Sequence, residues 1–433
     1  MRILRVHSWE GTRGGAEEYV WTISELLRQR GHPTHLLLLT SPGAELPPAP
    51  DESHVPVAAL TTGRSVHDLL GDSDLRRHLE HITEEFRPDV IHLHHITPAF
   101  STIGRWLSTQ SVPVVLTAHD AELVCPNESL MRPGNIVCEG GILPRCQFTG
   151  CAVGFGVPYK MLQRSTFDHY VAPSIRGYLC PSGALTSYLH AHGYRPTVHL
   201  PSFAPIPDSV LRAPTPPPAS EVPPTIGFLG RLEWYKGLDP LLRSIDLLAR
   251  TLPNVRLDIA GTGPAESGAR ELARTLGIAD RVSFRGQVRG VDKEEWFRGI
   301  HVATFPSIWF ENLAFVAMEA QARGRPVVGT EIGGNAEVVH DGEGGRIVPV
   351  GDPSALAQAF SEILRSPDLA RAMGERGRRW VLSEFTAERH LGRLLATYDA
   401  VLRGQRLASP VDAETLMSSR PREILGPPRV DAR

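Results

Sequence analysis

The sequence predicts an α/β protein made of two doubly wound parallel-sheet domains that face each other across a cleft. Three observations support this class. Short apolar, strand-like runs alternate with helical patterns, which is typical of parallel sheets covered by helices on both faces. A proline-rich run near the middle interrupts this alternation, which then restarts. The length of 433 residues is also sufficient for more than one domain core.

The first half contains four expected strands, at residues 3–6, 34–39, 90–93 and 113–117, with a helical pattern over 16–30. Eight prolines between residues 205 and 224 are too many for a helix or a central strand. We therefore expect an N-terminal Rossmann-like domain over 1–204, with a cysteine-rich insertion over 121–156, and a linker over 205–224.

The second half repeats the alternation. Strands are expected at 225–229, 255–260, 282–284, 302–305 and 326–329, and helices at 237–250, 267–276 and 313–323. Apolar residues at helical spacing predict a packed helix over 386–404. We expect a second Rossmann-like domain over 225–385 and a disordered tail over 405–433, where proline, serine and arginine dominate.

Composition and charge narrow the classes of partner and location that we expect for this protein. The net charge of −3 gives no electrostatic footprint for nucleic acid, so no nucleic-acid partner is expected. The first residues lack the charged and apolar regions of a signal peptide, and the longest apolar runs fall far short of a membrane span. We expect a cytoplasmic protein with at most peripheral membrane contact.

Two acids, Glu311 and Glu319, stand at the start of an expected apolar helix and within it. Their separation of eight residues corresponds to about 12 Å along a helix, which suits a ligand with polar ends on either side of a diphosphate. The free N–H groups near 312–314 would form an anion site between them. The alternative is that Glu311 is only a first-turn acid and Glu319 a solvated helix residue.

A basic loop, carrying Arg231 and Lys236, follows the first strand of the second half. The carboxyl edge of a parallel sheet is where such sheets bind ligands, so these cations could clamp a diphosphate. The chain has 45 basic residues but only three lysines, at 160, 236 and 293, so a lysine here stands out in an arginine-rich sequence. A solvated loop is the alternative.

Together these two elements resemble the nucleotide-sugar domain of retaining GT-B glycosyltransferases of family 4, also called glycosyl transferases group 1. The resemblance covers residues 225 to about 403, with further matching segments at 259–264, 282–286, 333–337 and 341–345. The first half matches more loosely, at 14–17, 87–95 and 115–120. The family fold is the pair of Rossmann-like domains expected above.

The resemblance implies roles in the second half. Glu319 would hold the ribose hydroxyls and Glu311 the hydroxyls of the donor sugar. The departing nucleoside diphosphate would be stabilised by cationic side chains and by the start of the helix, because its charge grows as the anomeric carbon becomes cation-like. The residues concerned are Arg231, Lys236, Asn312 and Leu313.

In the first half, the resemblance implies that Gly14 and Gly15 lie close to the donor phosphate and the acceptor. His119 is expected beside the reacting sugar, with His94 and Asp120 on the acceptor side. An alternative for the histidines at 92, 94 and 95 is simple packing at a strand end.

Catalysis in the family is thought to proceed by same-face attack without a protein nucleophile, so neither acid is assigned as one. No metal is needed where two cations and a helix dipole neutralise the leaving group. A competing Asp-x-Asp pattern at Asp72 and Asp74 is more simply a helix cap followed by a first-turn acid.

Four cysteines, Cys125, Cys138, Cys146 and Cys151, fall in the insertion with a spacing that lacks the paired Cys-x2-Cys of zinc knuckles. They could hold a structural zinc ion or an iron–sulfur cluster, or they could be reduced thiols in a redox-labile loop. Cys180, at the end of an expected strand, is predicted to be a buried core residue.

The sequence thus predicts a retaining hexosyltransferase that moves a sugar from a UDP-, GDP- or TDP-sugar to a hydroxyl of a glycan, a lipid-linked glycan or a small molecule, without a catalytic cofactor. One alternative is a non-catalytic partner protein that binds nucleotide sugars. Another is an epimerase, which needs no acceptor, or a phosphorylase, which needs free phosphate.

Overall fold

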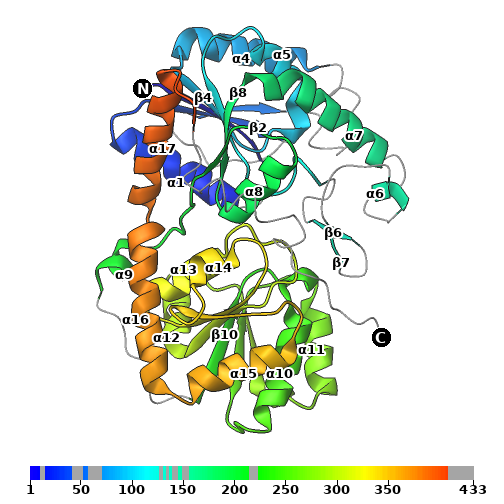
Figure 1. Cartoon of the computed structure of the whole chain (residues 1–433), viewed down its shortest axis with the longest axis vertical. Helices are drawn as coiled ribbons and strands as arrows, with labels where there is room; N and C mark the ends of the chain where they lie inside the picture. The colour runs from blue at the N-terminus through cyan, green and yellow to red at the C-terminus, as the bar shows by residue number, and fades with distance from the viewer. Residues whose placement is uncertain are drawn as a thin grey trace. The chain divides into compact units, whose positions relative to one another are not determined.

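The computed structural model describes residues 1–9, 15–40, 52–56, 71–125, 130–132, 136–138, 145–148, 156–213 and 223–407. The calls for Gly14, Cys151 and most of the tail lie outside these residues. Two compact units divide the described chain (Figure 1): residues 1–201 with 390–407 form most of the first, and residues 202–389 the second.

The first unit is built on a seven-stranded sheet in the order β3-β2-β1-β4-β5-β8-β9, in which neighbouring strands are parallel. Buried apolar strands are expected of parallel sheets covered on both faces, and Leu36–Leu39 of β2 are fully buried. The strands are β1 (Ile3–Trp9), β2 (Thr34–Thr40), β3 (Glu52–Pro56), β4 (Val90–Leu93), β5 (Val114–Thr117), β8 (Ile175–Cys180) and β9 (Thr197–His199).

The helices of the first unit include the last helix of the chain. They are α1 (Gly15–Gln29), α4 (Ser73–Phe86), α5 (Phe100–Leu107), α7 (Gly156–Thr166), α8 (Gly183–Ala191) and, from residue 390, α17 (Ala387–Leu402). Three short elements fall within the cysteine-rich insertion, namely β6 (Met131–Arg132), β7 (Ile136–Val137) and α6 (Arg145–Phe148). Leu391, Leu394, Tyr398 and Val401 are buried, as the helical spacing predicted, whereas Leu402 is exposed.

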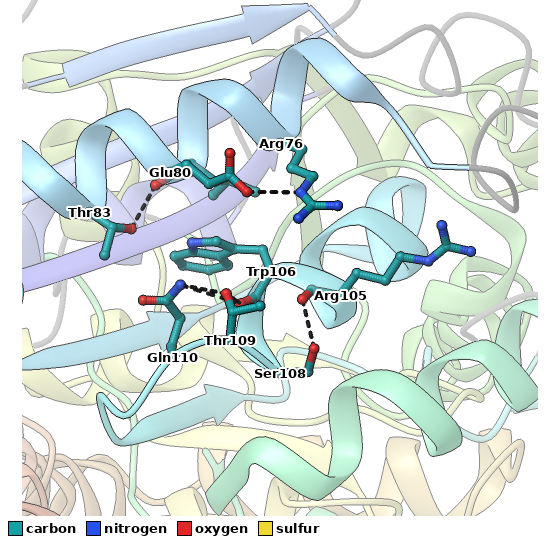
Figure 2. A network of polar contacts seen from close by, with 9 residues as sticks. Arg76, Glu80, Thr83, Arg105, Trp106, Ser108, Thr109 and Gln110 are labelled. Carbon is teal, nitrogen blue, oxygen red and sulfur yellow. Dashed lines mark hydrogen bonds and ion pairs between the residues drawn. The ribbon is translucent and has the colours of Figure 1, made fainter.

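Helix ends in the first unit show how local sequence sets the element bounds. The Asp72 carboxylate caps α4 by accepting from Asp74 N and Leu75 N, each at 2.9 Å, which confirms the capping interpretation of that acid. The end of α5 is closed by hydroxyls: Thr109 Oγ1 donates to Trp106 O at 2.7 Å, and Ser108 Oγ donates to Arg105 O (Figure 2).

The second unit contains a six-stranded parallel sheet in the order β12-β11-β10-β13-β14-β15. Its strand order reverses between β10 and β13, as in the doubly wound nucleotide-binding fold. The strands are β10 (Thr225–Leu229), β11 (Arg256–Ala260), β12 (Val282–Gly286), β13 (Val302–Phe305), β14 (Val327–Thr330) and β15 (Gly345–Val348).

Two apolar clusters show that helices of the second unit bury both faces of this sheet. One cluster joins the sheet to α10 (Leu238–Ala249), α11 (Glu266–Thr275) and α15 (Pro353–Leu364). The other joins it to α12 (Gly290–Gly299), α13 (Phe315–Ala322), α14 (Asn335–Val339) and α16 (Pro367–Glu384). The unit is therefore a three-layer α/β/α structure, visible in the lower half of Figure 1.

Three details differ from the sequence-based expectations. A short helix, α9 (Asp208–Arg212), lies within the expected linker, because the five residues after Pro207 contain no proline. The acid-motif helix begins at Phe315 rather than at 313, with Ala314 at its N-cap position. The short strands β3, β9 and β15 were not expected. None of the helices in the described ranges has the length and apolar character needed to cross a membrane.

Candidate active site

The acidic and basic motifs of the second unit meet at the reversal of strand order. Lys236 follows β10 and Glu311 follows β13, and these two strands are neighbours in the sheet. Their carboxyl ends flank the crevice where doubly wound sheets bind ligands. Two segments that are 75 residues apart in sequence are thereby brought into direct contact.

Glu311 is held by three donors that converge on one carboxylate oxygen. Oε2 accepts from Lys236 Nζ at 2.8 Å, from Ser307 Oγ at 2.9 Å and from Trp309 Nε1 at 2.8 Å. No described residue donates to Oε1. The Lys236 ammonium also lies 4.8 Å from the centre of the Trp309 ring, a cation–π distance. Glu311 is thus oriented with one oxygen occupied and the other able to accept from a ligand hydroxyl.

Two glycines allow the site loops to approach each other closely. Gly237 has a φ of +78°, and a Cβ there would lie 1.8 Å from the carbonyl oxygen of Pro306. Gly333 has a φ of +58°, and a Cβ would lie 2.0 Å from the carbonyl oxygen of Glu311. Gly237 therefore allows the Lys236 loop to pack against the loop that leads to Glu311. Gly333 allows its own loop to pack against the backbone of Glu311.

Glu319 lies on α13 and is 8% exposed, so the alternative of a solvated helix residue is wrong. Its Oε1 accepts from Lys293 Nζ at 2.7 Å, a pairing that sequence reasoning missed. The signal that could have found it was present, because Lys293 is one of only three lysines in the chain. Each acid of the motif is therefore paired with a lysine.

The first-turn alternative for Glu311 is also wrong, because this residue lies four positions before α13. Residues 311–314 are not helical, so the rise of 1.5 Å per residue does not measure the separation of the two acids. Asn312 and Leu313 precede the helix. The N–H groups at its positive end belong to the residues from Phe315 onward.

Arg231 does not contact either acid of the motif. Its guanidinium hydrogen-bonds to Glu233 Oε1 at 2.5 Å, and its side chain is 75% exposed. The second cation of the expected clamp is therefore solvated and paired locally, whereas Lys236 is only 22% exposed.

The first unit carries its candidate residues at the corresponding topological position. Its strand order reverses between β1 and β4. His94 directly follows β4, and His119 lies two residues after β5. Gly15 is the first residue of α1. The rings of His7, His94, His95 and His119, here called the histidine cluster, have centroids between 5.2 and 6.4 Å apart in their contacting pairs.

Burial keeps three rings of this cluster from charging. It lowers the pKa of His94 and His119 well below the ordinary value, and it lowers the pKa of His7 to about 4. The guanidinium of Arg5, fully buried on β1, acts in the same direction by repelling a second positive charge. The rings of His7, His94 and His119 are therefore neutral at neutral pH.

The packing alternative holds for His92, which belongs to a second hydrogen-bonded chain rather than to the cluster. His92 Nδ1 lies 2.6 Å from Tyr398 Oη, and its Nε2 lies 2.7 Å from Thr117 Oγ1. Tyr19 Oη lies 2.8 Å from His390 Nε2, and His390 Nδ1 donates to Pro201 O at 2.7 Å. These bonds fasten α17 to the sheet of the first unit.

Asp120 belongs to a group of three possible metal ligands. One ligand atom from each of His95, Asp120 and Glu122 lies within 4.8 Å of the others, a spacing that could hold a metal ion. Burial, together with repulsion from Glu122, raises the pKa of Asp120 to about 6. Asp120 is also 3.4 Å from His95 Nε2.

The cysteines do not form the expected cluster among the described residues. Cys125, Cys138 and Cys146 are buried and form no disulfide with one another, and no three ligand groups that include them come together there. Cys138 Sγ instead accepts from Arg132 Nε at 3.5 Å. Cys180 is fully buried at the end of β8, which confirms its predicted core position, and burial raises the pKa of its thiol to about 12.

Known structures share this architecture. Sucrose-phosphate synthase from Thermosynechococcus elongatus matches with a TM-score of 0.68 and 19% identity, covering 94% of this chain and 100% of that one. The Anabaena protein HepE in complex with UDP and glucose matches with a TM-score of 0.66 and 16% identity, covering 92% and 100%. The two Rossmann-like units thus define the GT-B fold class of glycosyltransferases.

Sequence comparison specifies the family. The model "Glycosyltransferase Family 4" matches residues 13–199, and "Glycosyl transferases group 1" matches residues 214–380. D-inositol 3-phosphate glycosyltransferase 2 of Catenulispora acidiphila is 30% identical over 390 residues, covering 84% of this chain and 85% of that protein. The chain belongs to glycosyltransferase family 4, as the motifs predicted.

Two other relatives differ in how much they cover. Phosphatidyl-myo-inositol mannosyltransferase of Mycobacterium leprae is 27% identical over 366 residues, 82% of this chain and 84% of that protein. D-inositol 3-phosphate glycosyltransferase of Streptomyces coelicolor is 38% identical, but only over 157 residues, so the match spans about a third of its length.

Proposed function

We propose that this protein transfers a sugar from a nucleoside-diphosphate sugar to an acceptor hydroxyl with retention at the anomeric carbon. The bond between the anomeric carbon and the phosphate oxygen breaks. A bond from that carbon to the acceptor oxygen forms on the same face. The acceptor's hydroxyl proton passes to the departing phosphate oxygen, so no protein nucleophile takes part.

The observation that carries this proposal is the arrangement around Glu311. Three donors fix its Oε2, and Oε1 remains to accept a hydroxyl of the donor sugar. Lys236 donates to the same carboxylate, and its ammonium can stabilise the negative charge that develops on the leaving diphosphate. Glu319, oriented by Lys293, suits the paired hydroxyls of the ribose.

We also propose that catalysis needs no metal ion. Lys236, Arg231 and the positive end of α13 provide the charge that a divalent cation would otherwise supply to the diphosphate. His119 contributes from the first unit beside the reacting sugar, with His94 and Asp120 on the acceptor side. The proposal does not depend on a structural metal at the cysteine-rich insertion, where the described Cys125, Cys138 and Cys146 do not come together.

The printed names of two relatives that match most of the chain guide the choice of acceptor. One is named for D-inositol 3-phosphate and the other for phosphatidyl-myo-inositol. We therefore place phosphorylated inositols first in the acceptor panel, followed by glycans, lipid-linked glycans and other small molecules. The donor base and sugar are left to experiment.

The test is donor-dependent melting combined with release of nucleoside diphosphate. UDP-, GDP- and TDP-sugars are added to the purified protein with and without EDTA, and then with each acceptor. We expect one donor to raise the melting temperature and to release its diphosphate slowly alone and faster with the correct acceptor. EDTA should change neither result, and product analysis should show the anomeric configuration retained.

Variants tie this activity to the site. Lys236→Met should lower kcat by about 100-fold, because a preorganised charge at the leaving group is lost. Glu319→Ala should weaken donor binding. Glu362→Ala, which removes an exposed acid paired with Arg346 on the same unit, is the matched control and should leave both unchanged. If no nucleotide sugar shifts the melting temperature, the proposed function is wrong.

A further inference from the structure

The histidine cluster contains a hydrogen-bonded line whose direction can be deduced. Arg5 Nη2 lies 2.9 Å from His94 Nε2, and His94 Nδ1 lies 3.0 Å from His119 Nε2. Arg5 and His94 are fully buried, and His119 is partly buried. The remaining donors of Arg5 include Nη1, which donates to Val20 O and to Ser24 Oγ at 2.7 Å.

The guanidinium sets the direction of the whole line. An arginine side chain has five N–H donors and no acceptor, so His94 Nε2 must accept. A neutral imidazole that accepts at one nitrogen carries its proton on the other, so His94 Nδ1 donates. His119 Nε2 must then accept from it. The single ring proton of a neutral His119 is consequently on Nδ1.

The ring orientation of His94 is supported independently of this logic. If the ring were turned by 180°, carbon atoms would face Arg5 Nη2 and His119 Nε2. A buried guanidinium N–H and the Nε2 of His119 would then both lose their hydrogen-bond partner, which is unfavourable. The His92 ring packs against the same ring, with centroids 4.2 Å apart.

We infer that Arg5 and His94 are positioning residues that fix the proton of His119 on Nδ1. In this tautomer His119 cannot act as a general base through Nε2, and its only hydrogen-bond donor is Nδ1–H. This inference rests on the proposed function only for its catalytic consequence. The tautomer itself is a property of the first unit.

The consequence fits the proposed reaction. A neutral donor beside the reacting sugar can bind a hydroxyl or phosphate oxygen without adding charge that would oppose the cation-like anomeric carbon. A protonated imidazole at that position would repel it. Arg5 contacts His119 through the ring of His94. It thereby selects the His119 tautomer that suits a retaining transfer.

Nitrogen NMR of the full chain labelled with ¹⁵N-histidine tests the tautomer directly. Two-bond proton–nitrogen correlations distinguish Nδ1–H from Nε2–H, and His119→Gln assigns the signal among the 18 histidines. We expect the Nδ1–H pattern for both His94 and His119 in the unmodified protein. An Nε2–H pattern for His119 would overturn the inference without any further variant.

Two variants of His94 that match each other in size are designed to keep or to reverse the direction of the hydrogen bond to His119. In His94→Asn, the amide oxygen faces donor-only Arg5, so the amide nitrogen still donates to His119 Nε2 and the tautomer is kept. In His94→Asp, a carboxylate paired with Arg5 accepts instead, so the His119 proton should move to Nε2. Circular dichroism and melting check that both variants are folded, and His81→Asn on the exposed face of α4 controls for loss of a histidine.

The kinetic comparison tests the catalytic consequence. The Asp variant should show a kcat about 100-fold below that of the Asn variant, with similar donor KM, because a positioned donor is lost in the reacting complex. Equal kcat values despite different tautomers would refute the catalytic role. Absence of donor-dependent release in the unmodified protein would instead refute the proposed function, while the NMR result would still decide the tautomer.

Discussion

The two units place polar side chains at the same topological position, the reversal of strand order, but they stabilise them by opposite means. In the second unit, Glu311 and Glu319 are each paired with a lysine, and these four side chains are between 10% and 26% exposed. In the first unit, Arg5, His94 and His119 are joined by hydrogen bonds between two neutral rings and one cation, and Arg5 and His94 are fully buried.

The difference shows what each arrangement can do when a ligand arrives. A partly exposed ion pair loses little when one partner is exchanged for ligand groups, because water and the ligand compensate both charges. In the line from Arg5 through His94 to His119, His94 uses both of its ring nitrogens within the protein, so it has none to exchange with a ligand. The second unit is therefore suited to binding a charged ligand, and the first to presenting one hydrogen in a fixed place.

The largest expected effect comes from separating the two loops that bring Lys236 and Glu311 together. Gly237→Ala adds a Cβ 1.8 Å from the Pro306 carbonyl oxygen at a positive φ, so the loop must move. We expect the free energy of unfolding of the second unit to fall by more than about 3 kcal/mol. Donor binding should be lost with it. Urea unfolding and donor titration measure both.

Gly277→Ala is the matched control for this substitution. Gly277 has a similar φ of +69°, but nothing lies within 4 Å of its added Cβ. It should cost only the backbone strain of an alanine in the left-handed region, about 1 kcal/mol. Equal losses for the two variants would show that close approach of the loops does not hold the site together.

Much of the fold could be predicted from the sequence, because parallel strands and amphipathic helices leave periodic apolar patterns. The strands expected at 225–229 and 302–305 coincide with β10 and β13. The start of α13 could not be predicted, since residues 313 and 314 are as apolar as the helix that follows and carry no capping side chain. The short strands β9 and β15 offer too few residues for a pattern.

The site was only partly predictable for a different reason. Lys236, Glu311 and Glu319 are recognisable because they stand in a local motif at a sheet edge. The partners Lys293 and Arg5 come from elements remote in sequence, and only the folded chain shows which acid or ring each one meets. Arg5 in particular lies inside an apolar strand, where no local pattern indicates a function.

The next effect concerns His390, which is buried in the first unit, and is measured through the pH dependence of stability. Burial lowers the pKa of His390 in the folded protein to about 4, against 6.5 for the free side chain. The unfolded chain therefore binds a proton first as the pH falls. This contribution to stability is complete above pH 6.5 and is lost progressively down to about pH 4, with a slope of about 1.4 kcal/mol per pH unit.

His390→Asn should remove that contribution to the slope. The amide can still donate to Pro201 O, so the variant should fold, while its stability should change less between pH 6.5 and 4.5. Urea unfolding at several pH values measures the difference. His81→Asn, at a side chain that is 63% exposed, should leave the slope unchanged. A slope identical in all three proteins would contradict the buried neutral state of His390.

The smallest effect should come from the second ion pair, and it sharpens the contrast between the two units. Lys293→Met leaves the Glu319 carboxylate without its cation beside the proposed diphosphate site, so the Kd for the donor nucleotide should rise about fivefold. Because the pair is partly exposed, this loss should shrink as salt screens the repulsion. Arg270→Met, which breaks the exposed pair with Glu266 on α11, is the control and should not affect binding. A fivefold loss that persists at high salt would show that Lys293 acts through a dry contact, as the residues of the first unit do, and the proposed division between the two units would then fail.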